Sequence, residues 1–186
     1  MNPPTELLLH AVNQVPSDEV LLLPNNKNII PVAQQVDALS DKIVRVVPTH
    51  SITEGFAALL EFDPEAAAED NRVAMTAAAS AIVAGEITQA VRNADSDAGP
   101  VTAGDYIGIG PSGISAVAGD VVTATTDLLA TLIQEDHELV TVIAGTGATE
   151  AGTALITNWL EEHHPDIELE VHHGEQPLYH YYLGIE

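Results

Sequence analysis

The sequence contains no cysteine. A disulfide framework, a thiolate zinc site and a cysteine nucleophile are therefore excluded, and any metal would need histidine and carboxylate ligands. The N-terminus lacks the basic and apolar regions of a signal peptide, and no apolar run approaches the roughly 20 residues that a transmembrane helix needs. We therefore expect a cytoplasmic protein without membrane insertion.

Basic residues are also scarce. Five Lys and Arg residues stand against 28 Asp and Glu residues, which gives a formal net charge of −23. Such a field repels nucleic acid and anionic membranes, so we expect neither as a partner. The acidity has two interpretations, which the composition leaves open: a solvated surface suited to a salty cytoplasm, or a docking face for a basic partner.

Apolar residues, in contrast, make up 46% of the 186 residues, enough to supply a core. Continuously apolar strands are predicted over 19–23 and 42–47, on either side of a helix predicted over 30–39. This pattern indicates a parallel βαβ unit that is buried on both faces. We predict an α/β (α+β) fold with two lobes: a parallel α/β lobe over 1–64, a connecting helix over 65–84, and a mixed, largely antiparallel lobe over 85–186.

The second lobe is predicted from short strands separated by glycine and proline turns. We expect strands over 86–91, 105–109, 113–117, 138–144, 167–172 and 179–185, and two helices capped by Asp120 and Thr149. The segment Asp95-Ser96-Asp97 is interpreted as a mobile loop between strands.

Both predicted parallel strands end in polar turns, Asn25 to Asn28 and Thr49 to Ser51. Ligands and partners usually meet such sheets at the carboxyl ends of the strands. Lys27 stands among asparagines in an acidic protein, so it could pair with a carboxylate or a phosphate. Equally, these side chains could simply satisfy the backbone of the turns.

Other patterns predict less. Gly145-Thr146-Gly147 is similar to a dinucleotide loop, but Glu150 stands where the third glycine should be, so we favour a tight turn before a capped helix. Ser112 lacks the second glycine of a nucleophile elbow. We favour a moderating role on the acidic surface over a metal site for the late histidines His163, His164, His172, His173 and His180. No catalytic or metal-binding residue is predicted.

Six motifs occur in an order that identifies a family. They are Leu23-Pro24-Asn25-Asn26-Lys27-Asn28-Ile29-Ile30, Val47-Pro48-Thr49-His50-Ser51-Ile52, Phe62-Asp63-Pro64, Gly85-Glu86-Ile87-Thr88, Gly104-Asp105-Tyr106-Ile107-Gly108 and Gly174-Glu175-Gln176-Pro177-Leu178-Tyr179. The whole chain resembles the C-terminal, DegV-like domain of the dihydroxyacetone-kinase-related fusion proteins, which are bacterial fatty acid kinase catalytic subunits. The chain departs from that pattern at Pro4, where the family has serine, and at Glu175, where it has glycine.

The resemblance implies a DegV-like two-lobe fold, with a first strand and helix of the α/β lobe before Met1. It also implies an upstream kinase domain that binds ATP and magnesium, in a parent formerly grouped with the glycerone kinases. The family's phosphotransfer residues have no counterpart here, so we expect no cofactor and no ATP turnover from these 186 residues alone.

The resulting functional hypothesis is a non-catalytic docking module. It would hold a DegV-type fatty-acid-binding protein so that the chain's own upstream kinase domain can phosphorylate the fatty acid. The alternative is a small-molecule (acyl or phosphate) binding or hydrolase domain that uses the cleft between the lobes. The predicted partner- or ligand-binding residues are Asn2, Thr5, Asn25, Asn26, Lys27, Asn28, Thr49, His50, Ser51, Gln176 and Tyr179.

Overall fold

A computed structural model describes residues 3–186, so the predicted site residue Asn2 lies outside the described residues. The chain divides into two compact units, unit 1 up to Ile82 and unit 2 from Val83 to Glu186. Each combines helices with strands, and unit 1 has a parallel sheet while unit 2 has a mixed one. The predicted mixed fold class is therefore confirmed.

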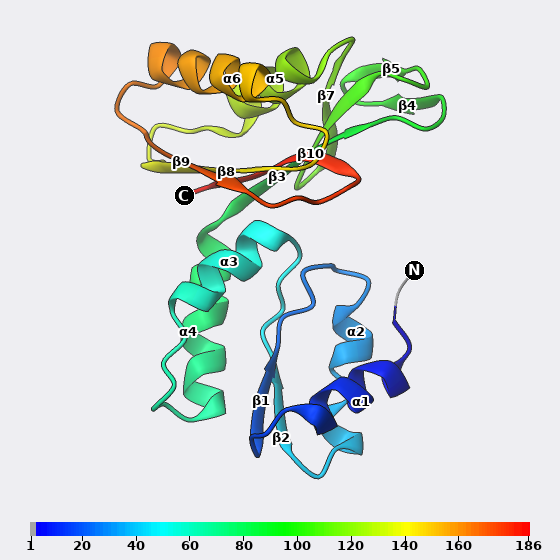
Figure 1. Ribbon diagram of the computed structural model, residues 1–186, viewed down its shortest axis with the longest axis vertical. Helices are drawn as coiled ribbons and strands as arrows, with labels where there is room; N and C mark the ends of the chain where they lie inside the picture. Colours follow the sequence, from blue (N-terminus) through cyan, green and yellow to red (C-terminus); the bar gives the residue numbers. More distant parts are fainter. Residues whose placement is uncertain (1–2) are drawn as a thin grey trace. The chain divides into compact units, whose positions relative to one another are not determined.

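Unit 1 is built on two parallel strands, β1 (Glu19–Leu22) and β2 (Ile43–Val46), in register from Glu19 opposite Ile43 to Leu22 opposite Val46. Its helices are α1 (Thr5–Gln14), α2 (Ile30–Ala33), the 3-10 helix η1 (Asp37–Leu39), α3 (Ile52–Leu60) and α4 (Ala68–Ala81). Figure 1 shows them around β1 and β2.

Alternate side chains of β1 enter two separate small cores, because neighbouring residues of a strand point to opposite faces. Val20 packs with Val44 against α1, in a cluster completed by Val12 and Val36. Leu21 and Leu23 pack on the other face, against a cluster of Val47, Ala58, Met75 and Ala79. The predicted βαβ unit buried on both faces is therefore present.

The helix predicted over 30–39 is interrupted. It forms as α2 and the separate 3-10 turn η1. Pro31 begins α2 as a favourable first-turn residue, and the Asp37 carboxylate then accepts a hydrogen bond from the Val44 backbone N–H at 3.0 Å. The competing side-chain bond fixes Asp37 beside β2, and the continuous helix was the wrong expectation.

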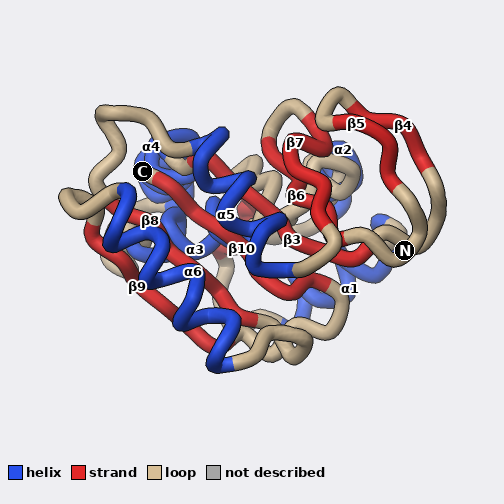
Figure 2. The backbone as a smooth tube through the Cα atoms, turned by 90° about the horizontal axis from the view of Figure 1, so that it is seen from above, coloured by secondary structure: helices blue, strands red, loops and turns tan. Residues whose placement is uncertain are grey.

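Unit 2 contains a six-stranded sheet in the order β7-β6-β3-β10-β8-β9. All neighbouring pairs are antiparallel except β8 and β9. The strands are β3 (Val83–Gln89), β6 (Tyr106–Gly110), β7 (Gly113–Ala118), β8 (Leu139–Ala144), β9 (Glu168–His173) and β10 (Tyr179–Ile185). Helices α5 (Val121–Leu132) and α6 (Glu150–His163) cover one face (Figures 1 and 2).

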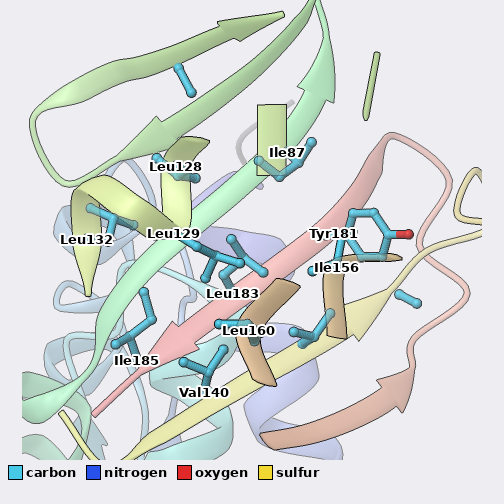
Figure 3. Close-up of a cluster of buried hydrophobic side chains, with 13 residues drawn as sticks. Ile87, Leu128, Leu129, Leu132, Val140, Ile156, Leu160, Tyr181, Leu183 and Ile185 are labelled. Carbon is cyan, nitrogen blue, oxygen red and sulfur yellow. The ribbon is translucent and has the colours of Figure 1, made fainter. Parts of the chain in front are cut away.

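The core of unit 2 lies between that sheet face and the two helices, as Figure 3 shows. It contains 13 buried residues, among them Leu128, Tyr181 and Leu183 at 0% exposure. Gly108 lets α5 approach closely, since a Cβ on it would lie 2.9 Å from Cβ of Leu128. The Tyr181 hydroxyl is satisfied by Thr153 Oγ1 at 3.0 Å.

Two local expectations for this part of the chain were wrong. The segment around Asp95 is a hairpin of β4 (Ala94–Ser96) and β5 (Gly99–Val101), closed by Gly99 at φ 113°. The helix predicted over 65–84 ends at Ala81, and β3 already begins at Val83. Among residues 3–186, no helix is long and apolar enough to cross a membrane.

Candidate functional site

The two polar loops of unit 1 are joined by a pair of hydrogen bonds. The Asn25 backbone N–H donates to Thr49 Oγ1 at 3.0 Å, and the Thr49 hydroxyl donates to Asn25 Oδ1 at 2.8 Å. Thr49 is fully buried. Asn25 takes φ 52°, a left-handed conformation that asparagine tolerates better than most residues. The carboxyl ends of β1 and β2 therefore form one connected surface, the paired-loop site (residues 25–28 and 49–51).

Helix α3 supports this connection. A Cβ on Gly55 would lie 2.2 Å from Asn25 Oδ1, so only glycine admits the Asn25 side chain here. Ser51 caps α3 by accepting a hydrogen bond from the Glu54 N–H at 3.1 Å, and it is itself 5% exposed. Ser51 and Thr49 therefore stabilise the loops from inside, and their predicted role in binding stays a prediction.

His50 is held by an acidic residue of the same helix. Glu54 Oε2 accepts a hydrogen bond from the His50 backbone N–H at 2.6 Å and lies 3.0 Å from His50 Nδ1. The His50 side chain is nevertheless 58% exposed. Its imidazole is thus oriented by Glu54 while its remaining surface faces solvent.

The first loop presents Asn26, Lys27 and Asn28 to solvent. The loop is fixed internally, because Asn26 Oδ1 accepts a hydrogen bond from the Asn28 backbone N–H at 2.9 Å. Lys27 makes no ion pair or hydrogen bond with any part of the chain that the structure describes.

The other cations of unit 1 are occupied. Lys42 donates to the backbone carbonyl oxygens of Val12 and Val15, at the end of α1. Arg45 pairs with Asp37 at 3.1 Å and with Glu69 at 2.9 Å. Arg72 also binds Glu69, and these contacts hold the pKa of Glu69 below its ordinary value. Within the described part of unit 1, Lys27 alone has a charge available to a partner.

The remaining predicted site residues make their contacts elsewhere in the chain. Thr5 begins α1, and its hydroxyl donates to Gln35 Oε1 at 3.4 Å. Gln176, in unit 2, donates from Nε2 to the Ile143 carbonyl oxygen at 2.9 Å and so fixes its own loop. No hydrogen bond between described residues joins Thr5 or Gln176 to Asn25 or Thr49.

Tyr179 belongs to a half-buried group on the sheet face opposite α5 and α6. Its ring lies 4.9 Å from that of Tyr182, and its hydroxyl hydrogen bonds to Glu86. Burial raises the pKa of Glu86 above its ordinary value, and the Tyr179 bond opposes that rise. Burial and the Glu86 charge together raise the pKa of Tyr182 to about 12. Glu86 and Tyr182 were not predicted as site residues, although the alternation along β3 and β10 could have placed them on one face.

The glycine loop before α6 is filled by the protein itself. A Cβ on Gly145 would lie 2.2 Å from the Tyr179 carbonyl oxygen, and one on Gly147 would lie 2.8 Å from the His180 ring. Thr149 caps α6 through a 3.0 Å bond from the Gly152 N–H. The glycines therefore serve close packing. No group of three or more His, Asp or Glu residues in the described chain is placed to hold a metal ion.

Comparison with known proteins adds relatives and folds. The chain is 36% identical over 186 residues to uncharacterised proteins of Staphylococcus aureus, for example from strains USA300 and NCTC 8325. It spans 34% of the length of these curated relatives.

The fold is shared with solved structures of low sequence identity. The Streptococcus pneumoniae fatty acid kinase B3 protein, loaded with linoleic acid, matches with a TM-score of 0.68 at 12% identity, over 99% of this chain and 76% of that one. The dihydroxyacetone kinase of C. freundii in complex with AMP-PNP and Mg²⁺ matches at 0.64 and 18%, over 98% and 41%. A fatty-acid-binding DegV family protein from Thermus thermophilus matches at 0.64 and 12%, over 98% and 77%.

A family model for the C-terminal region of FakA-like fatty acid kinase proteins matches residues 1–186. The match covers the order of motifs on which the paired-loop site is built. This chain belongs to the FakA-like C-terminal family of fatty acid kinases.

Proposed function

We propose that this chain is the docking module of a fatty acid kinase. The paired-loop site binds a DegV-type acyl-carrying protein and holds it so that a separate kinase domain phosphorylates the fatty acid. The observation that carries the proposal is the Asn25–Thr49 pair, which fixes two loops into one surface and leaves Asn26, Lys27 and His50 exposed.

The electrostatics of the site support recognition of another protein. In a chain of net charge −23, a basic partner is attracted at long range, which raises the rate of encounter. Lys27 then provides a local cation for a carboxylate on that partner, because no described group of its own chain neutralises it. Long-range attraction and local pairing therefore select for different features of the same partner.

The chemistry itself is assigned to other parts of the protein. Phosphoryl transfer needs metal ions and cations that neutralise developing charge. Three of the four cations of unit 1 are already bound within it, and the relatives are about three times as long as this chain. ATP and magnesium are accordingly proposed for the upstream kinase domain.

The alternative, a small-molecule site lined by Lys27, Thr49 and His50, is less well supported. Thr49 is fully buried, and its hydroxyl is engaged by Asn25. A ligand could reach it only after breaking the connection between the loops.

The test is a titration of the full-length protein with the acyl-loaded DegV-type protein of the same organism. Lys27→Glu is compared with Arg92→Glu, a matched reversal of charge at an exposed arginine of unit 2. We expect Lys27→Glu to weaken binding about tenfold, equivalent to about 1.4 kcal/mol, and Arg92→Glu to change it by less than about twofold.

Two results would contradict the proposal. The wild-type protein would show no affinity for the acyl-loaded partner at low salt, where electrostatic attraction is strongest. Alternatively, both substitutions would weaken binding equally, which would reduce the effect of Lys27 to net charge alone.

A further inference from the structure

The two edges of the β1–β2 sheet are treated differently by the rest of unit 1. In a strand, alternate residues direct their backbone N–H and C=O groups to opposite edges. An edge without a partner exposes these groups and invites another strand, so proteins usually close it with side chains or with a covering segment.

The outer edge of β2 is closed. The Val44 N–H donates to Asp37 Oδ1 at 3.0 Å, and the Val44 carbonyl oxygen accepts from Arg45 Nη1 at 2.9 Å. The interruption of the helix after α2 therefore has a structural consequence, since it brings the Asp37 carboxylate to the edge of the sheet.

The outer edge of β1 is open. The carbonyl oxygens of Asp18 and Leu22 accept from the N–H groups of Ile43 and Val47, which faces them toward β2. The intervening Leu21, and Leu23 after it, are consequently directed away from β2. Over residues 3–186, no other strand pairs with that edge.

A cavity of about 870 Å³ lies along the same strand. Leu21, Leu23, Leu59, Phe62 and Met75 provide apolar parts of its lining, and the ends of α3 and α4 form much of the rest. Leu59 is 59% exposed and Phe62 46% exposed, which is unusual for large apolar side chains beside a strand.

We infer that the open edge of β1 is a docking surface for one further extended strand, supplied by a part of the longer polypeptide outside residues 1–186. An extended peptide supplies both the hydrogen-bond partners that Leu21 and Leu23 need and the apolar side chains that fill the cavity. An alkyl chain could fill the cavity, but it would leave the backbone groups without partners at a cost of several kcal/mol in total.

The source of the strand follows from charge and length. A second copy of this chain would bring another −23 charges to an edge that already carries Asp18, Glu19 and Glu65. The curated relatives, in contrast, contain about twice as much additional polypeptide as this chain covers. A strand from the same polypeptide also has the advantage of a high effective concentration.

The test is amide hydrogen exchange on the full-length protein. We expect the Leu21 and Leu23 amides to exchange roughly 100-fold more slowly than an unpaired amide, and similarly to the Val47 amide, which is already paired with Leu22. Leu59→Lys is expected to accelerate exchange at Leu21 and Leu23 at least about tenfold. Leu7→Lys, at a leucine of α1 that is 56% exposed and outside the cavity, is the matched control and is expected to leave it unchanged.

Two outcomes overturn the inference. In the first, Leu21 and Leu23 of the monomeric full-length protein exchange like exposed amides, which shows that the edge stays open. In the second, the amides are protected only in a dimer and lose protection on dilution, which makes a second copy the occupant. Unchanged fast exchange in Leu59→Lys and in the wild type alike belongs to the first outcome.

Discussion

Unit 1 and unit 2 differ most in how their apolar residues are gathered. Unit 2 has 13 buried residues in one cluster between a six-stranded sheet and two helices. Unit 1 divides its core into two clusters of four buried residues each, on either side of two strands. Because stability follows the apolar area removed from water, unit 2 is the firmer scaffold and unit 1 the more easily opened part.

The difference is accompanied by a difference in polar chemistry. The buried polar side chains of unit 1 include Thr49, Ser51 and Thr53, all near the paired-loop site. Unit 2 uses its buried volume almost entirely for apolar packing. A small core beside a well-ordered polar surface suits a unit whose role is to bind, and a large core suits a unit whose role is to support.

The largest effect is expected from Leu128→Ala in unit 2. Leu128 is fully buried beneath Gly85 and Gly108, so its removal leaves a cavity that costs about 3–4 kcal/mol. Trp159 of α6 is the only tryptophan, and its fluorescence during urea unfolding reports on unit 2.

Met75→Ala makes the corresponding cavity in unit 1, where Met75 is 1% exposed. It is expected to leave the Trp159 transition nearly in place while accelerating amide exchange in α4. An equal shift of the Trp159 transition in both variants would show that the units unfold together, which would remove the contrast between them.

The second effect is expected from Asn25→Ala in unit 1. The substitution removes the acceptor of the Thr49 hydroxyl and places alanine at φ 52°, which together cost about 2 kcal/mol. Asn25→Gly keeps the backbone conformation but loses the side-chain bond, so it should cost about half as much. Amide exchange of residues 25–28 and 49–51 measures both, and Asn28→Ala, at an exposed side chain, is the control without effect.

The third effect concerns the pH dependence of unit 2. Burial raises the folded-state pKa of Glu86, so the folded protein binds this proton more tightly than the unfolded chain does. The resulting penalty is absent below the ordinary pKa of 4.5 and grows as the pH rises through the raised value. Glu86→Gln should therefore stabilise unit 2 at neutral pH by roughly 0.5–1 kcal/mol, and not at pH 4. Urea unfolding followed by Trp159 at both pH values checks this, and an equal gain at pH 4 would contradict it.

The smallest effect is expected at Glu175. This residue takes φ 55° in the loop between β9 and β10, a conformation that favours glycine. Glu175→Gly removes the strain but increases the freedom of the unfolded chain, so the net stabilisation is about 0.5 kcal/mol. A lower thermal midpoint for Glu175→Gly would show that the Glu175 side chain has a stabilising contact.

Much of the fold was predictable because the strands and helices have clear local signals. The strand predicted over 179–185 is β10 itself, and the helices capped by Asp120 and Thr149 begin where their caps indicate. The hairpin around Asp95 was missed because Asp, Ser and Gly are typical of loops, and only pairing across Gly99 shows that they form strands.

The candidate site was predictable only in part. Two polar turns at the ends of neighbouring parallel strands were enough to predict that Asn25 lies near Thr49. The dependence on Gly55, and the orientation of His50 by Glu54, arise from contacts across a helix that no sequence spacing reveals. Likewise, the availability of Lys27 depends on the partners that the other cations of unit 1 find in the folded chain.

Docking at the paired-loop site is tested most directly by the footprint of the acyl-loaded DegV-type protein on the full-length protein, measured by amide exchange. We expect increased protection at residues 25–28 and 50, with α5 and α6 unchanged. Protection confined to unit 2, with no change at residues 25–28, would contradict the proposal that the paired-loop site is the docking surface.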